Sequence, residues 1–118
     1  MKTAPTETDR EAGRAFVPWP AMRVMWTATS KRWERIADGT AHTGHPFAID
    51  TDDPATVGCM VAQVEAAAGA PVELWHCPDD PPDAAHVVFV RDPSFESFCS
   101  PTRGAALVAA MKALNGAP

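Results

Sequence analysis

Residues 53–69 carry both the start and the stop signals of a helix, and no other segment constrains the fold as much. Asp53 is a preferred N-terminal cap, Pro54 suits the first helical position, and Gly69 suits the residue after the last turn. Apolar residues at helical spacing predict a core face made of Val57, Met60, Val61, Val64 and Ala68. The opposite face is small rather than charged, so we expect this helix to be covered on two sides or to line an interface.

A second segment, residues 100–116, repeats this arrangement 47 positions later (53 to 100, 54 to 101 and 69 to 116). Ser100 is the expected cap, Pro101 the expected first helical residue, and Gly116 the expected stop. The apolar stripe of this segment consists of Leu107, Val108, Met111 and Leu114. We therefore predict two helices, over about residues 53–68 and 101–115.

Short strand candidates accompany the two helices. Residues 72–77 and 86–91 read as strands, and the Pro- and Asp-rich segment 78–83 between them predicts a turn. Residues 94–99 predict a further strand, and residues 46–50 predict a shorter one. The fold class that follows is α+β, a two-layer sandwich with a mainly antiparallel sheet of three to five strands and both helices on one face.

Residues 21–38 allow two interpretations. Apolar residues at helical spacing, followed by Gly39, favour a helix. The alternation within VMWTAT favours instead a hairpin that turns at Ser30 and Lys31. We favour strands, because the segment contains threonines and a serine that are poor helix formers.

A length of 118 residues suits one domain, which we expect over residues 21–118. Residues 1–20 predict a flexible tail that ends in a Pro-stiffened apolar segment, in which Phe16 and Trp19 are candidate anchors. No run of about 18 apolar residues predicts a membrane span, and the N-terminus lacks the apolar stretch of a secretory signal. We therefore expect a cytoplasmic protein whose three cysteines are reduced.

The net charge of −5 conceals an uneven distribution. Residues 21–37 carry four basic residues and one acidic residue, a balance of +4 − 1 = +3. Residues 38–99 carry eleven acidic residues against Arg91, a balance of +1 − 11 = −10. An acidic middle repels nucleic acid and attracts basic surfaces, so we expect a protein partner with a basic surface rather than direct nucleic-acid binding.

Candidate partner-binding residues fall into two groups. Acidic and aromatic residues surround the 78–83 turn, and arginines interleave with tryptophans, the usual interface anchors, in residues 26–35. The candidates are Glu73, Trp75, Asp79, Asp80 and Asp83 in the first group, and Trp26, Arg32, Trp33 and Arg35 in the second.

Metal-ligating and nucleophilic residues are present, but their spacing is poor. His42, His45, His76 and His86 are the candidate zinc ligands, and no C-x-x-C pair accompanies them. His76 and His86 are candidates to meet across the hairpin, whereas His76 and its neighbour Cys77 point to opposite faces of a strand. We predict no catalytic residues, no cofactor and no enzymatic activity.

Two patterns carry a resemblance: Asp53-Pro54-Ala55-Thr56, followed by Gly58 and Cys59, and the Ala-rich stretch 106–111. Together they resemble small open reading frames common in bacteriophages and prophages of GC-rich bacteria. The resemblance covers about the C-terminal two thirds of the chain. It implies an accessory role inside a bacterial host cell, with binding rather than catalysis.

Three functional hypotheses remain open. The first is a phage-type accessory protein that binds a basic protein partner, for example an inhibitor of the anti-CRISPR type whose carboxylates occupy a groove meant for phosphates. The second is a structural or virion-assembly protein that self-associates through the alanine faces of its helices. The third is a zinc-binding module.

Overall fold

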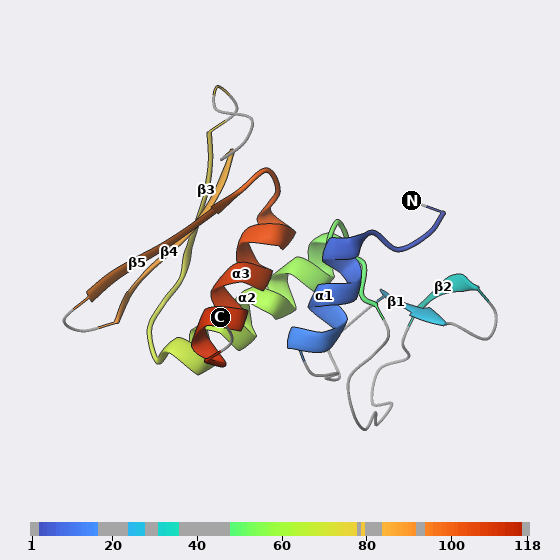
Figure 1. The fold of residues 1–118 in the computed structure, drawn as a ribbon, viewed down its shortest axis with the longest axis horizontal. Coiled ribbons are helices and arrows are strands. Elements are labelled where there is room, and N and C mark those ends of the chain that lie inside the picture. The colour runs from blue at the N-terminus through green and yellow to red at the C-terminus, as the bar shows by residue number, and fades with distance from the viewer. Residues whose placement is uncertain are drawn as a thin grey trace. The chain divides into compact units, whose positions relative to one another are not determined.

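A computed structural model describes residues 3–16, 24–27, 31–35, 48–77, 79, 84–91 and 94–116. The described residues form the elements α1 (Glu7–Ala15), β1 (Val24–Thr27), β2 (Arg32–Arg35), α2 (Pro54–Ala68), β3 (Glu73–His76), β4 (Ala85–Arg91), β5 (Ser94–Ser100) and α3 (Arg103–Leu114) (Figure 1). The chain divides into two compact units, Met1–Cys59 and Met60–Pro118, where the sequence predicted a single domain over residues 21–118. None of the helices in the described part is long and apolar enough to cross a membrane.

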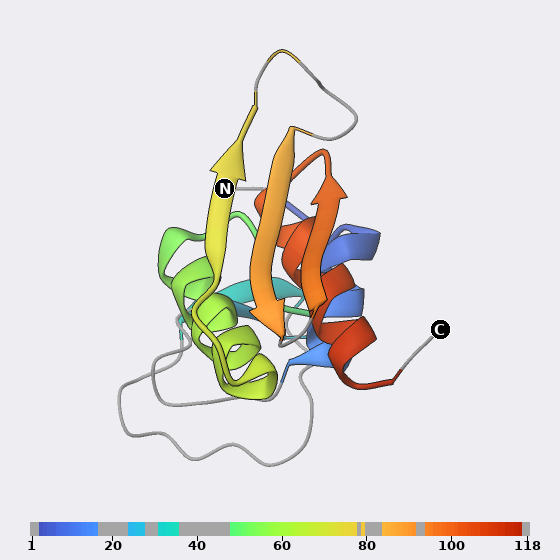
Figure 2. The same ribbon diagram turned by 90° about the vertical axis from the view of Figure 1, so that its left-hand side faces the viewer.

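The second unit has the predicted α+β architecture. Strands β3, β4 and β5 form an antiparallel sheet in that spatial order. Helix α3 packs on β4 and β5, and the C-terminal half of α2 lies on the same side of the sheet (Figures 1 and 2). The core between the layers is apolar and includes Met60, Val64, Val87, Phe89, Leu107 and Met111. Burial of these side chains is the main force that holds the two layers together.

The two long helices begin and end close to the predicted positions. Asp53 caps α2, because its Oδ2 accepts a hydrogen bond of 3.0 Å from the backbone N–H of Thr56. Gly69 and Gly116 both have positive φ, 69° and 78°, as expected of residues that follow a helix. The predicted cap of α3 is wrong. Ser100 is instead the last residue of β5, where it pairs with Ala85.

Thr102 is the cap of α3. Its hydroxyl oxygen accepts a hydrogen bond of 3.2 Å from the backbone N–H of Ala105. Helix α3 therefore starts at Arg103, two residues after the predicted first residue Pro101, because the sheet holds Ser100 in an extended conformation. Pro101 lies between β5 and α3. Proline has no backbone N–H, and at this position neither the strand ladder nor the helix needs one.

The first unit contains a helix where the sequence predicted a flexible tail. Thr6 and Asp9 form a reciprocal capping box at the start of α1, in which each side chain accepts from the other residue's backbone N–H. Asp9 is fully buried, and so is Phe16 at the end of the helix. Phe16, one of the two candidate anchors, is therefore part of the buried interior, whereas the other, Trp19, lies outside the described residues.

Asp9 also joins α1 to a segment 42 residues away. Its Oδ1 accepts hydrogen bonds from the backbone N–H of Thr51 at 3.1 Å and from the Thr51 hydroxyl at 2.7 Å. The backbone carbonyl of Asp9 accepts from the N–H of Ile49. These contacts hold Ala48, Ile49 and Asp50 in the interior of the first unit.

The hairpin favoured for residues 21–38 is confirmed in its described part. Strands β1 and β2 pair antiparallel, with Trp26 directly opposite Trp33. The two indole rings meet edge to face with centroids 5.4 Å apart, a favourable arrangement for aromatic pairs. Lys31, directly before β2, has a φ of 55°, a left-handed conformation that is uncommon for a residue other than glycine.

Candidate functional site: the outer face of the sheet

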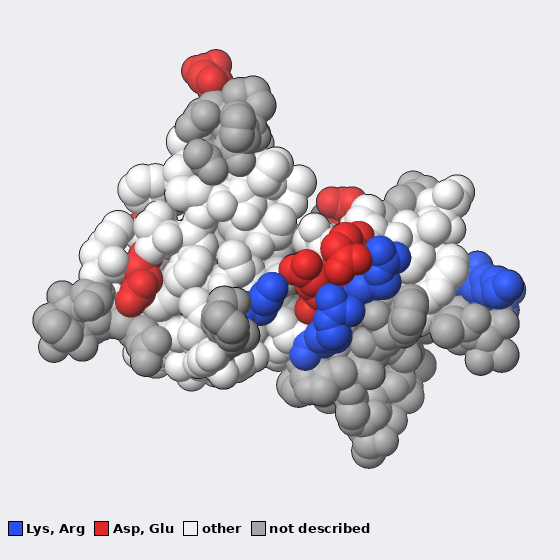
Figure 3. All heavy atoms as spheres, in the orientation of Figure 1, with Lys and Arg blue, Asp and Glu red and all other residues white. Residues whose placement is uncertain are grey.

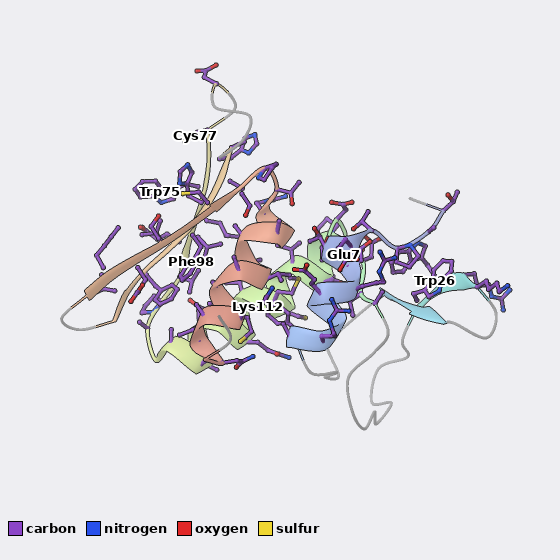
Figure 4. All side chains as sticks on the ribbon, viewed as in Figure 1. Glu7, Trp26, Trp75, Cys77, Phe98 and Lys112 are labelled. Atoms are coloured by element: carbon purple, nitrogen blue, oxygen red, sulfur yellow. The ribbon has the colours of Figure 1, made fainter. Side chains whose placement is uncertain are left out.

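The strand register sorts the side chains of β3, β4 and β5 onto two faces. Cross-strand partners share a face, and successive residues alternate between faces. The face that points away from α3, named here the outer face, carries Glu73, Trp75, His86, Val88, Val90, Phe95, Ser97 and Cys99. Figure 4 shows Trp75 on this side of the sheet and Phe98 on the other.

The outer face exposes large apolar side chains. Trp75 is 50% exposed, Val90 57% and Phe95 66%, whereas Val88 between them is 4% exposed. An antiparallel sheet with one solvated face normally carries polar residues on that face. Clustered exposed apolar side chains on a soluble fold mark an interaction surface. Figure 2 looks onto this face, with α3 behind it.

One row of the outer face contains a thiol and an imidazole in contact. Trp75, His86 and Cys99 lie directly across from one another on three adjacent strands. The Sγ of Cys99 is 2.9 Å from Nδ1 of His86 and 3.9 Å from the hydroxyl of Ser97. Cys99 is exposed and His86 is half-buried, so small solutes can reach this pair.

The predicted meeting of His76 and His86 across the hairpin is wrong. His76 lies opposite Ala85 and His86 lies opposite Trp75, so the two imidazoles project to opposite faces. Among the described residues, no group of three or more His, Cys, Asp or Glu side chains is arranged to hold a metal ion. His42 and His45 lie outside the described residues.

The acidic candidates are only partly described. Glu73 and Asp79 are exposed, and Asp80 and Asp83 lie outside the described residues. The backbone N–H of Cys77 donates to the carbonyl of Ala84 and closes the hairpin below this turn. Figure 3 shows acidic atoms at the end of the β3–β4 connection, whereas the surface of the sheet in that view is mostly uncharged.

Several other acids of the acidic middle have structural roles. Asp50 accepts a hydrogen bond from the backbone N–H of Asp52, and Asp53 caps α2. Glu65 accepts from the backbone N–H of Val72 at 3.0 Å and so orders the connection into β3. The charge balance of residues 38–99 therefore overstates the number of carboxylates that a partner can reach.

The second predicted group lies in the first unit, on the β1–β2 hairpin. Trp26 and Trp33 are half-buried against each other, so they are partly used in folding. Arg32 is exposed, and the side chain of Arg35 lies outside what the structure describes. The two groups of candidates thus belong to different compact units.

A depression at the β3 edge of the sheet adjoins the outer face. It is lined by Leu74, Trp75, His76 and Arg103. Trp75 lies on the outer face and also lines this depression. It is more exposed than Trp26 and Trp33, the other tryptophans among the predicted partner-binding residues.

Sequence reasoning missed the contact between His86 and Cys99, although a signal for it was present. Arg91 pairs with Ser94, so two residues separate β4 from β5, and this short connection fixes every other pair of the hairpin. Counting back from it places His86 opposite Cys99.

Comparison of the chain with protein-family models, curated proteins and solved structures finds no match.

Proposed function

We propose that this chain is a small binding protein that recognises another protein through the outer face of its β3–β4–β5 sheet. The observation that carries the proposal is the joint exposure of Trp75, Val90 and Phe95 on one face of a sheet whose other face is covered by α3. Exposed aromatic residues on a rigid sheet offer a large contact area that loses little conformational entropy on binding.

Charge supports a basic partner. Glu73 on the outer face and Asp79 in the adjoining turn are exposed carboxylates. Acids at the rim of an apolar patch increase the association rate with a basic surface and add specificity. The partner therefore combines an apolar centre with a basic rim, which is also typical of proteins that bind nucleic acids.

The resemblance to phage open reading frames suggests which kind of partner this surface would bind. A phage-type accessory protein that covers the basic groove of a host nucleic-acid-binding protein, in the manner of an anti-CRISPR inhibitor, fits both the acidic charge and the exposed apolar face. The described residues offer no metal-ligating group that favours the zinc alternative.

The test is affinity capture from a lysate of a GC-rich bacterium with the unchanged chain and with the W75A/F95A double variant. We expect basic proteins to be captured by the unchanged chain and reduced at least about tenfold by the double variant, because two anchors are removed. Identical captured proteins from both chains would contradict the proposal. A matched control, V72A, alters a half-buried residue just before β3 that lies outside the outer face.

Salt separates the apolar and electrostatic parts of the contact. High salt is expected to slow association without abolishing binding, because it screens Glu73 and Asp79 but leaves the apolar centre intact. The Asp79→Asn variant is expected to reproduce part of the salt effect.

Self-association is the second candidate function, and one observation favours it. Ala55, Ala62 and Ala66 on the small face of α2 are all exposed, as a helix that meets a second copy would require. Light scattering at high concentration tests this alternative. A strict monomer contradicts it and leaves the outer-face proposal untouched.

A further inference from the structure

The chain contains three free cysteines in three different environments. Cys59 is half-buried in α2, Cys77 is exposed just after β3, and Cys99 is exposed on β5. The Sγ of Cys99 lies 2.9 Å from Nδ1 of His86. Cys77 directly follows His76 in the chain, but within the described part of the structure neither the Cys77 thiol nor the Cys59 thiol hydrogen-bonds to an imidazole. The three thiols therefore differ in access and in the presence of a base.

A thiol reacts as a nucleophile after it loses its proton, and an adjacent base that takes this proton promotes the attack. A base must lie within hydrogen-bonding reach of the proton that it takes, and Nδ1 of His86 meets that condition for Cys99. The register of β4 and β5 fixes this contact, because His86 and Cys99 are direct cross-strand partners within two paired strands.

We propose that Cys99 is a modification site that forms mixed disulfides with low-molecular-weight disulfides, and that His86 acts as its base. In this step the Sγ proton passes to Nδ1 of His86, and the sulfur attacks one sulfur of a disulfide R–S–S–R. The R–S–S–R bond breaks as the Cys99–S–S–R bond forms. The leaving RS⁻ then takes the proton from His86 and departs as RSH. Cys99 is oxidised, and the departing sulfur is reduced.

The product is expected to persist rather than to close into an internal disulfide. Cys77 follows β3 and Cys99 belongs to β5, with β4 between them. Two strand spacings of about 4.8 Å each separate their backbones by about 10 Å. A disulfide requires Cα atoms closer than about 7 Å. Cys77 therefore cannot resolve the adduct on the folded sheet, but it provides an internal reference for the reactivity of an exposed thiol.

The test is reaction of the full chain with oxidised glutathione at neutral pH, with the modified cysteines located by mass spectrometry at short reaction times. We expect Cys99 to be modified at least about tenfold faster than Cys77, because general-base assistance gives a rate advantage of that order or more. The His86→Gln variant is expected to bring the rate of Cys99 down to that of Cys77 while the rate of Cys77 stays unchanged.

Two results would overturn the proposal: equal rates at Cys77 and Cys99 in the unchanged chain, or an unchanged Cys99 rate in His86→Gln. Far-UV circular dichroism checks that the His86→Gln variant keeps its fold, since the rate of the exposed Cys77 does not depend on folding. If the variant unfolds, the order of the rates in the unchanged chain decides the question by itself.

Discussion

The two faces of the β3–β4–β5 sheet are built from the same strands but differ in how far their apolar side chains are buried. On the inner face, Val87 and Phe89 are buried under α3, and Phe89 stacks on Phe98 with ring centroids 6.0 Å apart. On the outer face, Val90 and Phe95 are of similar chemistry and remain mostly exposed. Val87 and Phe89 stabilise the fold through burial, and so does Val88 on the outer face, whereas Val90 and Phe95 contribute little to stability in this way. This difference in burial is the reason why we propose the outer face as a contact surface.

The largest expected loss of stability comes from a substitution on the inner face. Phe89→Ala removes a buried ring and leaves a cavity against α3, so we expect a loss of about 3–5 kcal/mol in the free energy of unfolding. Phe95→Ala removes an exposed ring and is expected to change stability by less than about 0.5 kcal/mol. Urea denaturation measures both. Equal losses would show that the outer face also supports the fold.

A buried carboxylate in the first unit sharpens the comparison, because its hydrogen bonds to Thr6 and Thr51 stabilise a different unit from the one that contains the sheet. Asp9→Ala leaves the N–H of Thr6 and both donors of Thr51 without their acceptor. We expect a loss of about 2–4 kcal/mol, since each unmet buried donor is costly. Hydrogen exchange is expected to accelerate in α1 and to stay unchanged in β4. Equal acceleration in β4 would argue against separate units.

A smaller effect is expected at the cap of α3, the helix that covers the inner face. Thr102→Ala removes the side-chain oxygen that accepts from the N–H of Ala105 and is expected to cost about 1 kcal/mol. Ser100→Ala is the matched control, because Ser100 lies in β5 and does not cap the helix. Thermal melting compares the two. A larger loss from Ser100→Ala would return the cap to residue 100.

The smallest effect is expected at an exposed ion pair of α1, in the first unit. A hydrogen bond from the Arg10 guanidinium, 2.7 Å from Glu7, and the charge of Arg10 hold the pKa of the Glu7 carboxyl below its ordinary value. The stabilisation is therefore present above the ordinary pKa and is lost as the pH falls through the lowered one. An NMR titration is expected to show a higher Glu7 midpoint in Arg10→Gln; an unchanged midpoint would contradict this cause.

Local signals in the sequence were sufficient for the elements that depend on local chemistry. Asp53, Gly69 and Gly116 marked helix ends through capping and backbone conformation, and these positions are confirmed. The cap of α3 was misplaced because strand pairing extends to Ser100, and pairing is a property of two segments rather than one. Helix α1 was missed because most of its residues are polar and because Thr51, the buried hydrogen-bond partner of its Asp9, lies 42 residues away.

The candidate site was harder to predict than the fold. Residues 87–90 are a continuous apolar run, so alternation does not reveal which of them face solvent. Trp75 was predicted as a contact residue and is exposed, whereas Val90 and Phe95 were not singled out. Which face is covered depends on where α3 packs, and that position follows from the whole second unit rather than from any single strand.

Site-specific photo-crosslinking tests the central claim most directly. A photoreactive side chain placed at Val90 on the outer face, or at Ala66 on the exposed face of α2, is irradiated in a bacterial lysate. The account predicts that position 90 captures a partner protein and that position 66 does not. Capture from position 66 without capture from position 90 would contradict the claim that the outer face is the binding surface.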